Sequence, residues 1–103
     1  MDRSTLHKEM KHRLENAYGQ RLRGVVLYGS EARGEATADS DVDVLVLLSG
    51  APSMRDDLDA IDALYPLTLA YGRPLSPKVI DAQEYERRDC PLYRSVHREG
   101  VPL

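Results

Sequence analysis

The order of apolar and polar residues along the 103-residue chain predicts helices and strands in alternation. In two long segments apolar side chains recur every three or four residues, as they do on one face of a helix. Shorter runs rich in valine and leucine have the composition of strands. The predicted elements are helices over residues 4–18, from Ser53 onward and between Pro91 and Gly100, and strands over residues 24–28, 42–48 and 75–80. This alternation favours an α/β or α+β domain built around a small mixed sheet.

Single positions within these elements predict where each one lies. Residues 42–48 are almost wholly apolar, which is typical of a central strand, whereas Pro77 places the third strand at an edge. Ser53 would cap the second long helix, and the acidic run from Asp56 to Asp59 would be its solvated first turn. One face of this helix is expected to be buried, and it carries Met54, Leu58, Ile61 and Leu64.

Composition and charge narrow the functional classes. A chain of 103 residues can form one domain with a small core, to which no Trp or Phe contributes. The net charge of −3 argues against non-specific nucleic-acid binding, which needs a basic excess. Cys90 is the single cysteine and cannot form an internal disulfide, and no apolar run approaches a membrane span. We therefore expect a cytoplasmic protein that contacts neither membrane nor nucleic acid and that works beside a partner subunit.

Two carboxylates stand at the start of the predicted central strand. Asp41 and Asp43 are two residues apart, so on a strand they share one face and lie about 6–7 Å from each other. Ionised neighbours repel each other, and a divalent cation removes that repulsion. Mg²⁺ prefers hard oxygen ligands, and a pair of ions about 3.5–4 Å apart can stabilise both oxygens of a phosphoryl or nucleotidyl transfer. The pair is therefore a candidate metal site.

The loop between the first two strands supplies groups suited to phosphate. Gly29 follows the first strand and lets backbone approach a ligand closely. Ser30 offers a hydroxyl and a backbone N–H, particularly if a helical turn begins there, and Arg33 can contact phosphate oxygens through two N–H groups. The order of these elements indicates a nucleotide site: a strand is followed by a loop of small residues and then by an apolar strand that begins with two carboxylates.

The stretch LYGSEARGEATADSDVDVLVLL, from Leu27 to Leu48, resembles the signature of the polymerase-β-like nucleotidyltransferase superfamily. More narrowly it is similar to minimal nucleotidyltransferases, the MNT antitoxins of HEPN/MNT toxin–antitoxin pairs. The C-terminal PLYRSVHREGVPL also resembles the ends of such chains. The resemblance implies a single minimal nucleotidyltransferase domain over residues 1–103, with a small mixed sheet and helices packed on one side.

The same resemblance implies an activity and a partner. The expected reaction is the Mg²⁺-dependent transfer of AMP from ATP to a tyrosine of a HEPN toxin, an RNase that this modification silences. Asp41 and Asp43 would be the catalytic metal ligands, with two Mg²⁺ ions expected, and Gly29, Ser30 and Arg33 would bind the nucleotide. The superfamily usually adds a third carboxylate from a neighbouring strand. Ser76 aligns with that position, and Asp81 is the alternative metal ligand if the alignment shifts.

The absence of an acid at Ser76 leaves more than one function open. The first is an enzyme that adenylylates a protein partner, with slow turnover. The second is an antitoxin that neutralises its toxin by binding it, with a weak or idle active site. A small-molecule transferase of the aminoglycoside-modifying kind is a third alternative, although 103 residues leave little room for the second domain that would hold the acceptor.

Overall fold

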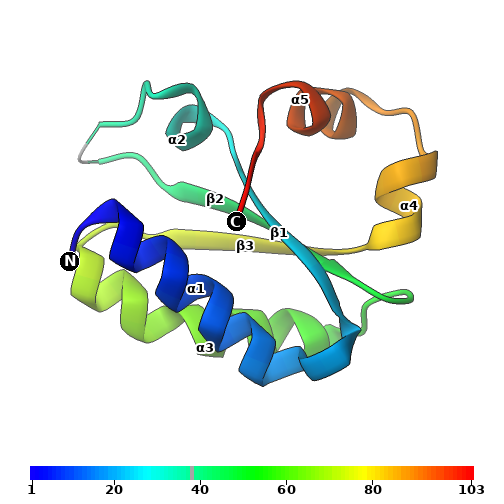
Figure 1. Ribbon diagram of the computed structural model, residues 1–103, viewed down its shortest axis with the longest axis horizontal. Coiled ribbons are helices and arrows are strands. Elements are labelled where there is room, and N and C mark those ends of the chain that lie inside the picture. The colour runs from blue at the N-terminus through cyan, green and yellow to red at the C-terminus, as the bar shows by residue number, and fades with distance from the viewer. Residues whose placement is uncertain (38) are drawn as a thin grey trace.

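A computed structural model describes residues 1–37 and 39–103 as a four-stranded sheet with helices on both faces (Figure 1). Ala38, within the predicted loop, lies outside the described residues. The helices and strands are α1 (Arg3–Tyr18), β1 (Leu22–Tyr28), α2 (Ser30–Arg33), β2 (Val42–Leu48), α3 (Met54–Tyr71), β3 (Leu75–Asp81), α4 (Ala82–Arg87), α5 (Pro91–Glu99) and β4 (Val101–Pro102). A short 3₁₀ turn, Gly19–Arg21, joins α1 to β1. The predicted helices and strands are confirmed, and α4 and β4 are additions.

The sheet is mixed, as predicted. Its strands lie in the order β3-β2-β1-β4, so β2 is central and β3 is at an edge. β1 runs antiparallel to both β2 and β4, whereas β2 and β3 are parallel because α3 crosses over between them. In this register Tyr28, at the end of β1, lies opposite Asp43, near the start of β2. The loop from β1 to β2 therefore closes over the first residues of the central strand.

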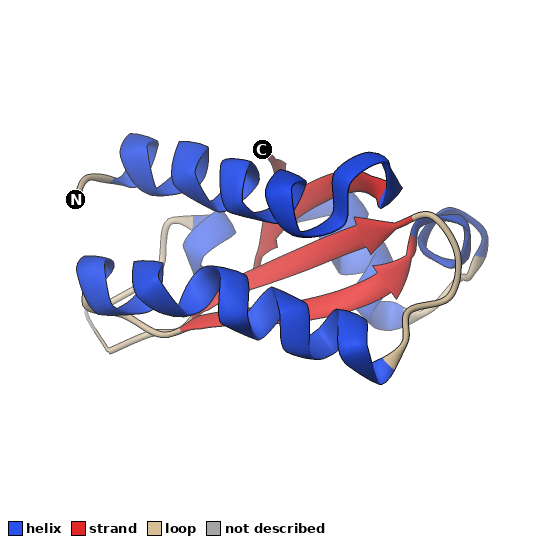
Figure 2. Ribbon diagram, turned by 90° about the horizontal axis from the view of Figure 1, so that it is seen from below, coloured by secondary structure: helices blue, strands red, loops and turns tan. Residues whose placement is uncertain are grey.

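Helices cover the two faces of the sheet unequally. The long helices α1 and α3 lie side by side on one face and bury the valines of β2 (Figure 2). This agrees with the family resemblance, which implied helices packed on one side of the sheet. The shorter α4 and α5 cover the other face, which that expectation did not include. The physical reason is that β2 is apolar on both faces: Leu45 and Leu47 point away from α1 and α3, and Tyr85, Tyr93 and Val96 pack over them. In the described residues, no helix combines the length and the apolar character that crossing a membrane requires.

The predicted buried face of α3 is wrong except at Leu64. The residues of this helix that face the core are Asp56, Ala60, Leu64 and Leu67. Met54, Leu58 and Ile61 point to solvent, with exposed fractions of 80%, 49% and 51%. α3 carries apolar residues on two opposite sides, and helical periodicity alone cannot decide which of the two packs on the sheet.

Asp56 lies inside the protein, which corrects the expected solvated first turn. Its carboxylate accepts hydrogen bonds from Arg21 Nη1 and Nη2 at 2.9 and 2.8 Å and from the Ser53 N–H at 2.9 Å. Ser53 Oγ accepts from the Asp56 N–H in return, which completes a capping box. The Tyr18 hydroxyl donates to the Asp56 carbonyl at 2.6 Å. Hydrogen bonds from Arg21 hold the pKa of Asp56 well below its usual range, and burial raises the pKa of Tyr18 to about 12.

We expect Asp56→Ala to lower the free energy of unfolding by about 2 kcal/mol at pH 7, because it leaves Arg21 and the helix cap without their acceptor. The folded-state pKa of Asp56 lies below the unfolded value of about 3.9, so its contribution is complete above about pH 4 and is lost as pH falls towards the folded-state pKa. Urea denaturation at pH 7 and pH 3 should therefore show a smaller gap between wild type and variant at pH 3.

The matched control is Asp57→Ala, which removes an exposed acid one residue further along the same turn. We expect this variant to stay within about 0.5 kcal/mol of wild type at both pH values. Equal losses in the two variants would contradict a specific role for Asp56.

Candidate active site

The two predicted carboxylates meet at the open end of the central strand. Asp41 immediately precedes β2 and is exposed, whereas Asp43 is its second residue and is half-buried. Val42, Val44 and Val46 point the other way into the core beneath α1 and α3, as the alternation predicts. The carboxylate pair therefore stands at the start of a strand whose two faces are both buried, and this packing holds the strand in place.

Gly29 brings the backbone of the loop directly against Asp43. Its φ is +74° and its ψ is −153°, a conformation that is essentially restricted to glycine. A Cβ atom at this position would lie 2.5 Å from Asp43 Oδ2. Ser30 follows as the first residue of α2, so the turn that carries the candidate phosphate-binding groups lies beside Asp43.

The electrostatics of the site disfavour full ionisation of both Asp41 and Asp43 when no cation is bound. Burial and the neighbouring charge of Asp41 raise the pKa of the Asp43 carboxyl, and only the positive charge of Arg33 opposes them. Arg33 itself pairs with Glu35 (Nε–Oε2 3.2 Å) and Glu99 (Nη1–Oε2 3.6 Å). Its side chain is 39% exposed, so an anionic ligand could draw it from these pairs. A positive charge placed between the two carboxylates would relieve their repulsion.

The third strand places a serine beside the pair. Ser76 lies opposite Asp43 in the parallel register, and its Oγ is 3.4 Å from Asp41 Oδ2. Asp81 lies opposite Leu48 at the far end of the strand, about 16 Å further along at about 3.3 Å per residue. Its carboxylate accepts the Gln83 N–H at 2.9 Å and caps α4. The geometry therefore separates Asp81 from the pair, and the alternative alignment that made it a metal ligand is incompatible with this register.

A buried ion-pair network behind the loop is a part of the site that sequence reasoning missed. Glu31 is 3% exposed and contacts Arg73 Nη2 at 2.9 Å and Arg3 Nε at 3.1 Å. Arg73 also donates from Nε to the Ser40 carbonyl at 2.9 Å, one residue before Asp41. The network thus joins α2, the segment before β2 and the turn from α3 to β3. Glu31 directly follows the Gly29-Ser30 pair, but its partners are distant in sequence and nothing local identifies them.

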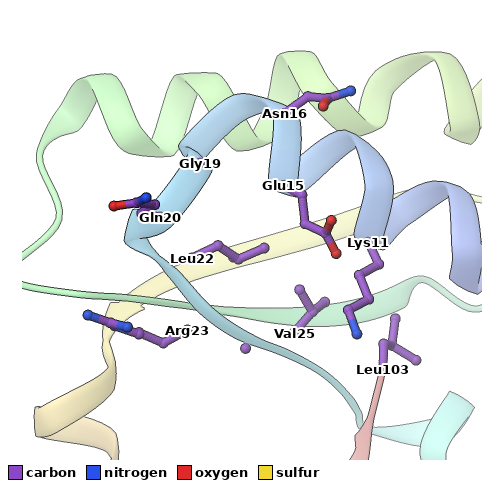
Figure 3. A pocket seen from close by; sticks show the side chains of 10 residues that line it. Lys11, Glu15, Asn16, Gly19, Gln20, Leu22, Arg23, Val25 and Leu103 are labelled. Carbon is purple, nitrogen blue, oxygen red and sulfur yellow. The ribbon is translucent and has the colours of Figure 1, made fainter.

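A separate groove of about 610 Å³ lies away from the carboxylates. Figure 3 shows it between the second half of α1 and the first residues of β1, with Lys11 and Glu15 above it and Leu103 at one end. Because Leu22 begins β1 and Gly29 follows its last residue, this groove and the carboxylate site lie at opposite ends of the strand. The groove is therefore not part of the candidate active site.

A carboxylate pair at the start of the central strand thus lies directly under a glycine turn. The chain belongs to the family whose description is "Nucleotidyltransferase domain", and the family profile matches residues 5–100. The fold is that of the polymerase-β-like minimal nucleotidyltransferases, and the chain is an enzyme of the nucleotidyltransferase class.

Individual proteins resemble the chain along most of its length. A protein of Methanocaldococcus jannaschii named "Putative protein adenylyltransferase" is 30% identical over 100 residues, covering 93% of this chain and 92% of its own. A solved minimal nucleotidyltransferase is 28% identical with a TM-score of 0.58, covering 100% of this chain and 97% of its own. A solved complex of a tri-AMPylated Shewanella oneidensis HEPN toxin with an MNT antitoxin has a matching chain with a TM-score of 0.61 and 15% identity, covering 96% of this chain and 69% of that one.

Gly29 and Gly34 allow a test of the close approach to Asp43. Both have positive φ, at +74° and +72°, but a Cβ atom on Gly34 meets nothing within 4 Å. We expect Gly34→Ala to cost about 1 kcal/mol of unfolding free energy from its backbone alone and Gly29→Ala to cost at least about 2 kcal/mol. Gly29→Ala should also lose Mn²⁺ binding because it displaces the Asp43 carboxylate. Urea denaturation and Mn²⁺ titration measure the two effects, and undiminished Mn²⁺ binding by Gly29→Ala would contradict this account.

Proposed function

We propose that this chain is an MNT-type antitoxin that transfers AMP from ATP to a tyrosine of a HEPN toxin partner, and that the reaction depends on Mg²⁺. The observation that carries the proposal is the contact between Gly29 and Asp43, which joins a phosphate-binding turn to a carboxylate pair. The relative named as a protein adenylyltransferase supports the transfer of AMP to protein. The complex of an AMPylated HEPN toxin with an MNT antitoxin supports the kind of partner.

The donor set of the site fits Mg²⁺. Asp41 and Asp43 offer hard carboxylate oxygens, and burial together with the charge of Asp41 raises the pKa of Asp43, an effect that a bound cation would oppose. Within residues 1–37 and 39–103, no group of three or more His, Cys, Asp or Glu side chains comes together, so the triphosphate and water would complete the coordination. Mg²⁺, when bound, supplies charge neutralisation on the phosphates and polarises the reacting oxygens. We propose two such ions, both held by this carboxylate pair.

The chain's own residues would then hold and orient the nucleotide. Gly29 lets the turn pass directly over Asp43, which places Ser30 beside the carboxylates, and Ser30 can donate its hydroxyl and N–H to the phosphates. Arg33 can leave Glu35 and Glu99 to contact a phosphate, a more highly charged anion. In the transfer the tyrosine oxygen would bond to the α-phosphorus of ATP, the bond to the β-phosphate would break, and pyrophosphate would leave. The tyrosine proton would pass to water, because Ser76 stands where an acid would otherwise assist this deprotonation. Since general-base assistance is typically worth about 10²–10⁴-fold, we expect slow transfer over minutes to hours.

Ser76 also supports a second candidate function. An antitoxin with a weak active site could neutralise its toxin by direct binding, with no nucleotide consumed. In either case the proposed ligands are an NTP and a HEPN toxin in a hetero-oligomer, without direct contact to nucleic acid. A reaction that uses ATP and silences an RNase would take place in the cytoplasm.

We expect Asp41→Asn/Asp43→Asn to lose Mg²⁺-dependent ATP binding while the fold survives. The neutral amides cannot offset the charge of the cation. Because the folded-state pKa of Asp43 is raised, its charge destabilises the fold at neutral pH, so the variant should unfold at equal or higher urea than wild type. This advantage should vanish as pH falls below the unfolded pKa of about 3.9, where Asp43 is protonated in both states.

Isothermal calorimetry with Mg²⁺-ATP measures the loss of binding, and Asp39→Asn is the matched control, because Asp39 is an exposed acid of the same loop. Asp39→Asn should bind Mg²⁺-ATP within about threefold of wild type, since surface charges contribute little. Undiminished binding by the double variant would rule out this metal site.

The enzymatic and the binding mechanisms predict different ratios of this chain to silenced toxin. If the chain is an enzyme, a small amount with Mg²⁺-ATP should silence an excess of toxin, and the toxin should stay silent and gain AMP mass after the chain is removed. Ser76→Asp should transfer AMP at an equal or greater rate, and Asp81→Asn should leave the rate unchanged because Asp81 caps α4. Mass spectrometry of the toxin reads the outcome. A toxin that gains no AMP after prolonged incubation, and is inhibited only at a fixed subunit ratio, would identify a binding antitoxin instead.

A further inference from the structure

The exposed large apolar side chains gather on the outer face of α3. Seven such residues are exposed in the described chain, and five of them lie on this helix with exposed fractions from 49% to 80%. They are Met54, Leu58, Ile61, Tyr65 and Leu69, which we call the α3 stripe. Their spacing of four, three, four and four residues aligns them along one side of the helix, over about 22 Å at 1.5 Å per residue.

The α3 stripe lies opposite the side of the helix that packs on the sheet. The core side carries Ala60, Leu64 and Leu67, and about 130° of helical rotation separates it from the stripe at about 100° per residue. A helix that is apolar on both sides is normally covered on both sides. Monomeric proteins rarely expose continuous apolar patches larger than a few hundred Å², so the stripe indicates an interface.

The stripe can pair with itself, and this self-complementarity points to the occupant. When the helix is laid antiparallel on itself, Met54 meets Leu69 and Leu58 meets Tyr65. The two copies of Ile61 then lie beside the axis, which falls between Ile61 and Asp62. We propose that α3 pairs antiparallel with the α3 of a second copy of this chain, around a two-fold axis near Ile61. Such an interface uses the same patch twice, which is the requirement for a closed dimer.

Charge favours the antiparallel arrangement. The exposed charges of α3 lie between Arg55 and Asp62, since Asp56 is buried against Arg21, and no charged residue follows Asp62 in the helix. Arg55 pairs with Asp59, so Asp57 and Asp62 leave this half of the helix negative. Antiparallel pairing places this acidic half alongside the uncharged half of the partner, and the two helix dipoles oppose each other. Parallel pairing would place acid against acid along the interface. Since Asp43 lies on the opposite face of the sheet from α3, the dimer would leave the active site open, and the inference does not rest on the proposed function.

Disulfide cross-linking tests both the contact and its direction, in a background in which Cys90→Ser removes the native thiol. Ile61→Cys lies beside the proposed axis and should form a covalent dimer at least about tenfold faster than Met54→Cys, whose counterpart is Leu69. The variant with both Met54→Cys and Leu69→Cys should cross-link readily, because each thiol then meets the other across the pair. Rapid cross-linking of Met54→Cys alone would indicate parallel pairing and overturn the proposal.

Sedimentation equilibrium of the full chain tests self-association without cross-linking. A stripe of this length is shorter than a standard interface, so we expect a micromolar dimer, with twice the chain's 11.6 kDa at about 100 μM. Ile61→Glu should be monomeric at that concentration, and Tyr65→Glu provides a second disruptive variant. Ala70→Glu adds the same charge to an exposed position of α3 off the stripe and should remain dimeric. A wild-type chain of monomer mass at 100 μM overturns the proposal, and loss of toxin binding by Ile61→Glu would then assign the stripe to the toxin.

Discussion

The space between the Gly29 backbone and the Asp43 carboxylate is too small for a side chain, and the rest of the active site depends on this contact. The antiparallel register places Tyr28 opposite Asp43, so the chain must turn immediately after β1 and pass over the carboxylate. Only glycine tolerates both the backbone conformation and the 2.5 Å position that a Cβ would take. The turn then presents Ser30 at the start of α2, beside the carboxylates. Ser30 and the carboxylates can therefore act on one ligand.

The carboxylates of Asp56, in the first turn of α3, and Asp43, on β2, lie in opposite electrostatic environments. Asp56 is almost completely buried, yet Arg21 and Ser53 supply its hydrogen bonds, and its pKa lies well below the usual range. Asp43 is half-buried, and its burial, together with repulsion from Asp41, raises its pKa. The protein itself therefore satisfies the first carboxylate, which stabilises the fold. The second is the one that we propose as a cation ligand, because a bound cation would oppose the burial and repulsion that raise its pKa.

The sheet separates the two surfaces for which we propose functions. The carboxylates, α2, α4 and α5 lie on one side, and α1 and α3 lie on the other (Figure 1). A buried carboxylate anchors an ion pair in each of two loops: Glu31 with Arg73 holds the loop before β2, and Asp56 with the half-exposed Arg21 holds the first turn of α3. Pairing through α3 would thus leave the nucleotide site accessible to a protein substrate, and each surface can be altered without the other.

The sequence by itself determined the order of the elements, the central position of β2, the edge position of β3 and the carboxylate pair on one face of a strand. Each of these follows from local patterns: alternation along a strand, a proline, and glycine and serine beside an apolar run. The tertiary structure alone decided which side of α3 is buried, because that helix is apolar on both sides. It also decided that Ser76 rather than Asp81 lies beside Asp43, since the parallel register depends on how the crossover through α3 packs. The burial of Asp56 and the network around Glu31 were beyond reach for the same reason: their ion-pair partners lie 28 to 42 residues away along the chain, and only packing brings them together.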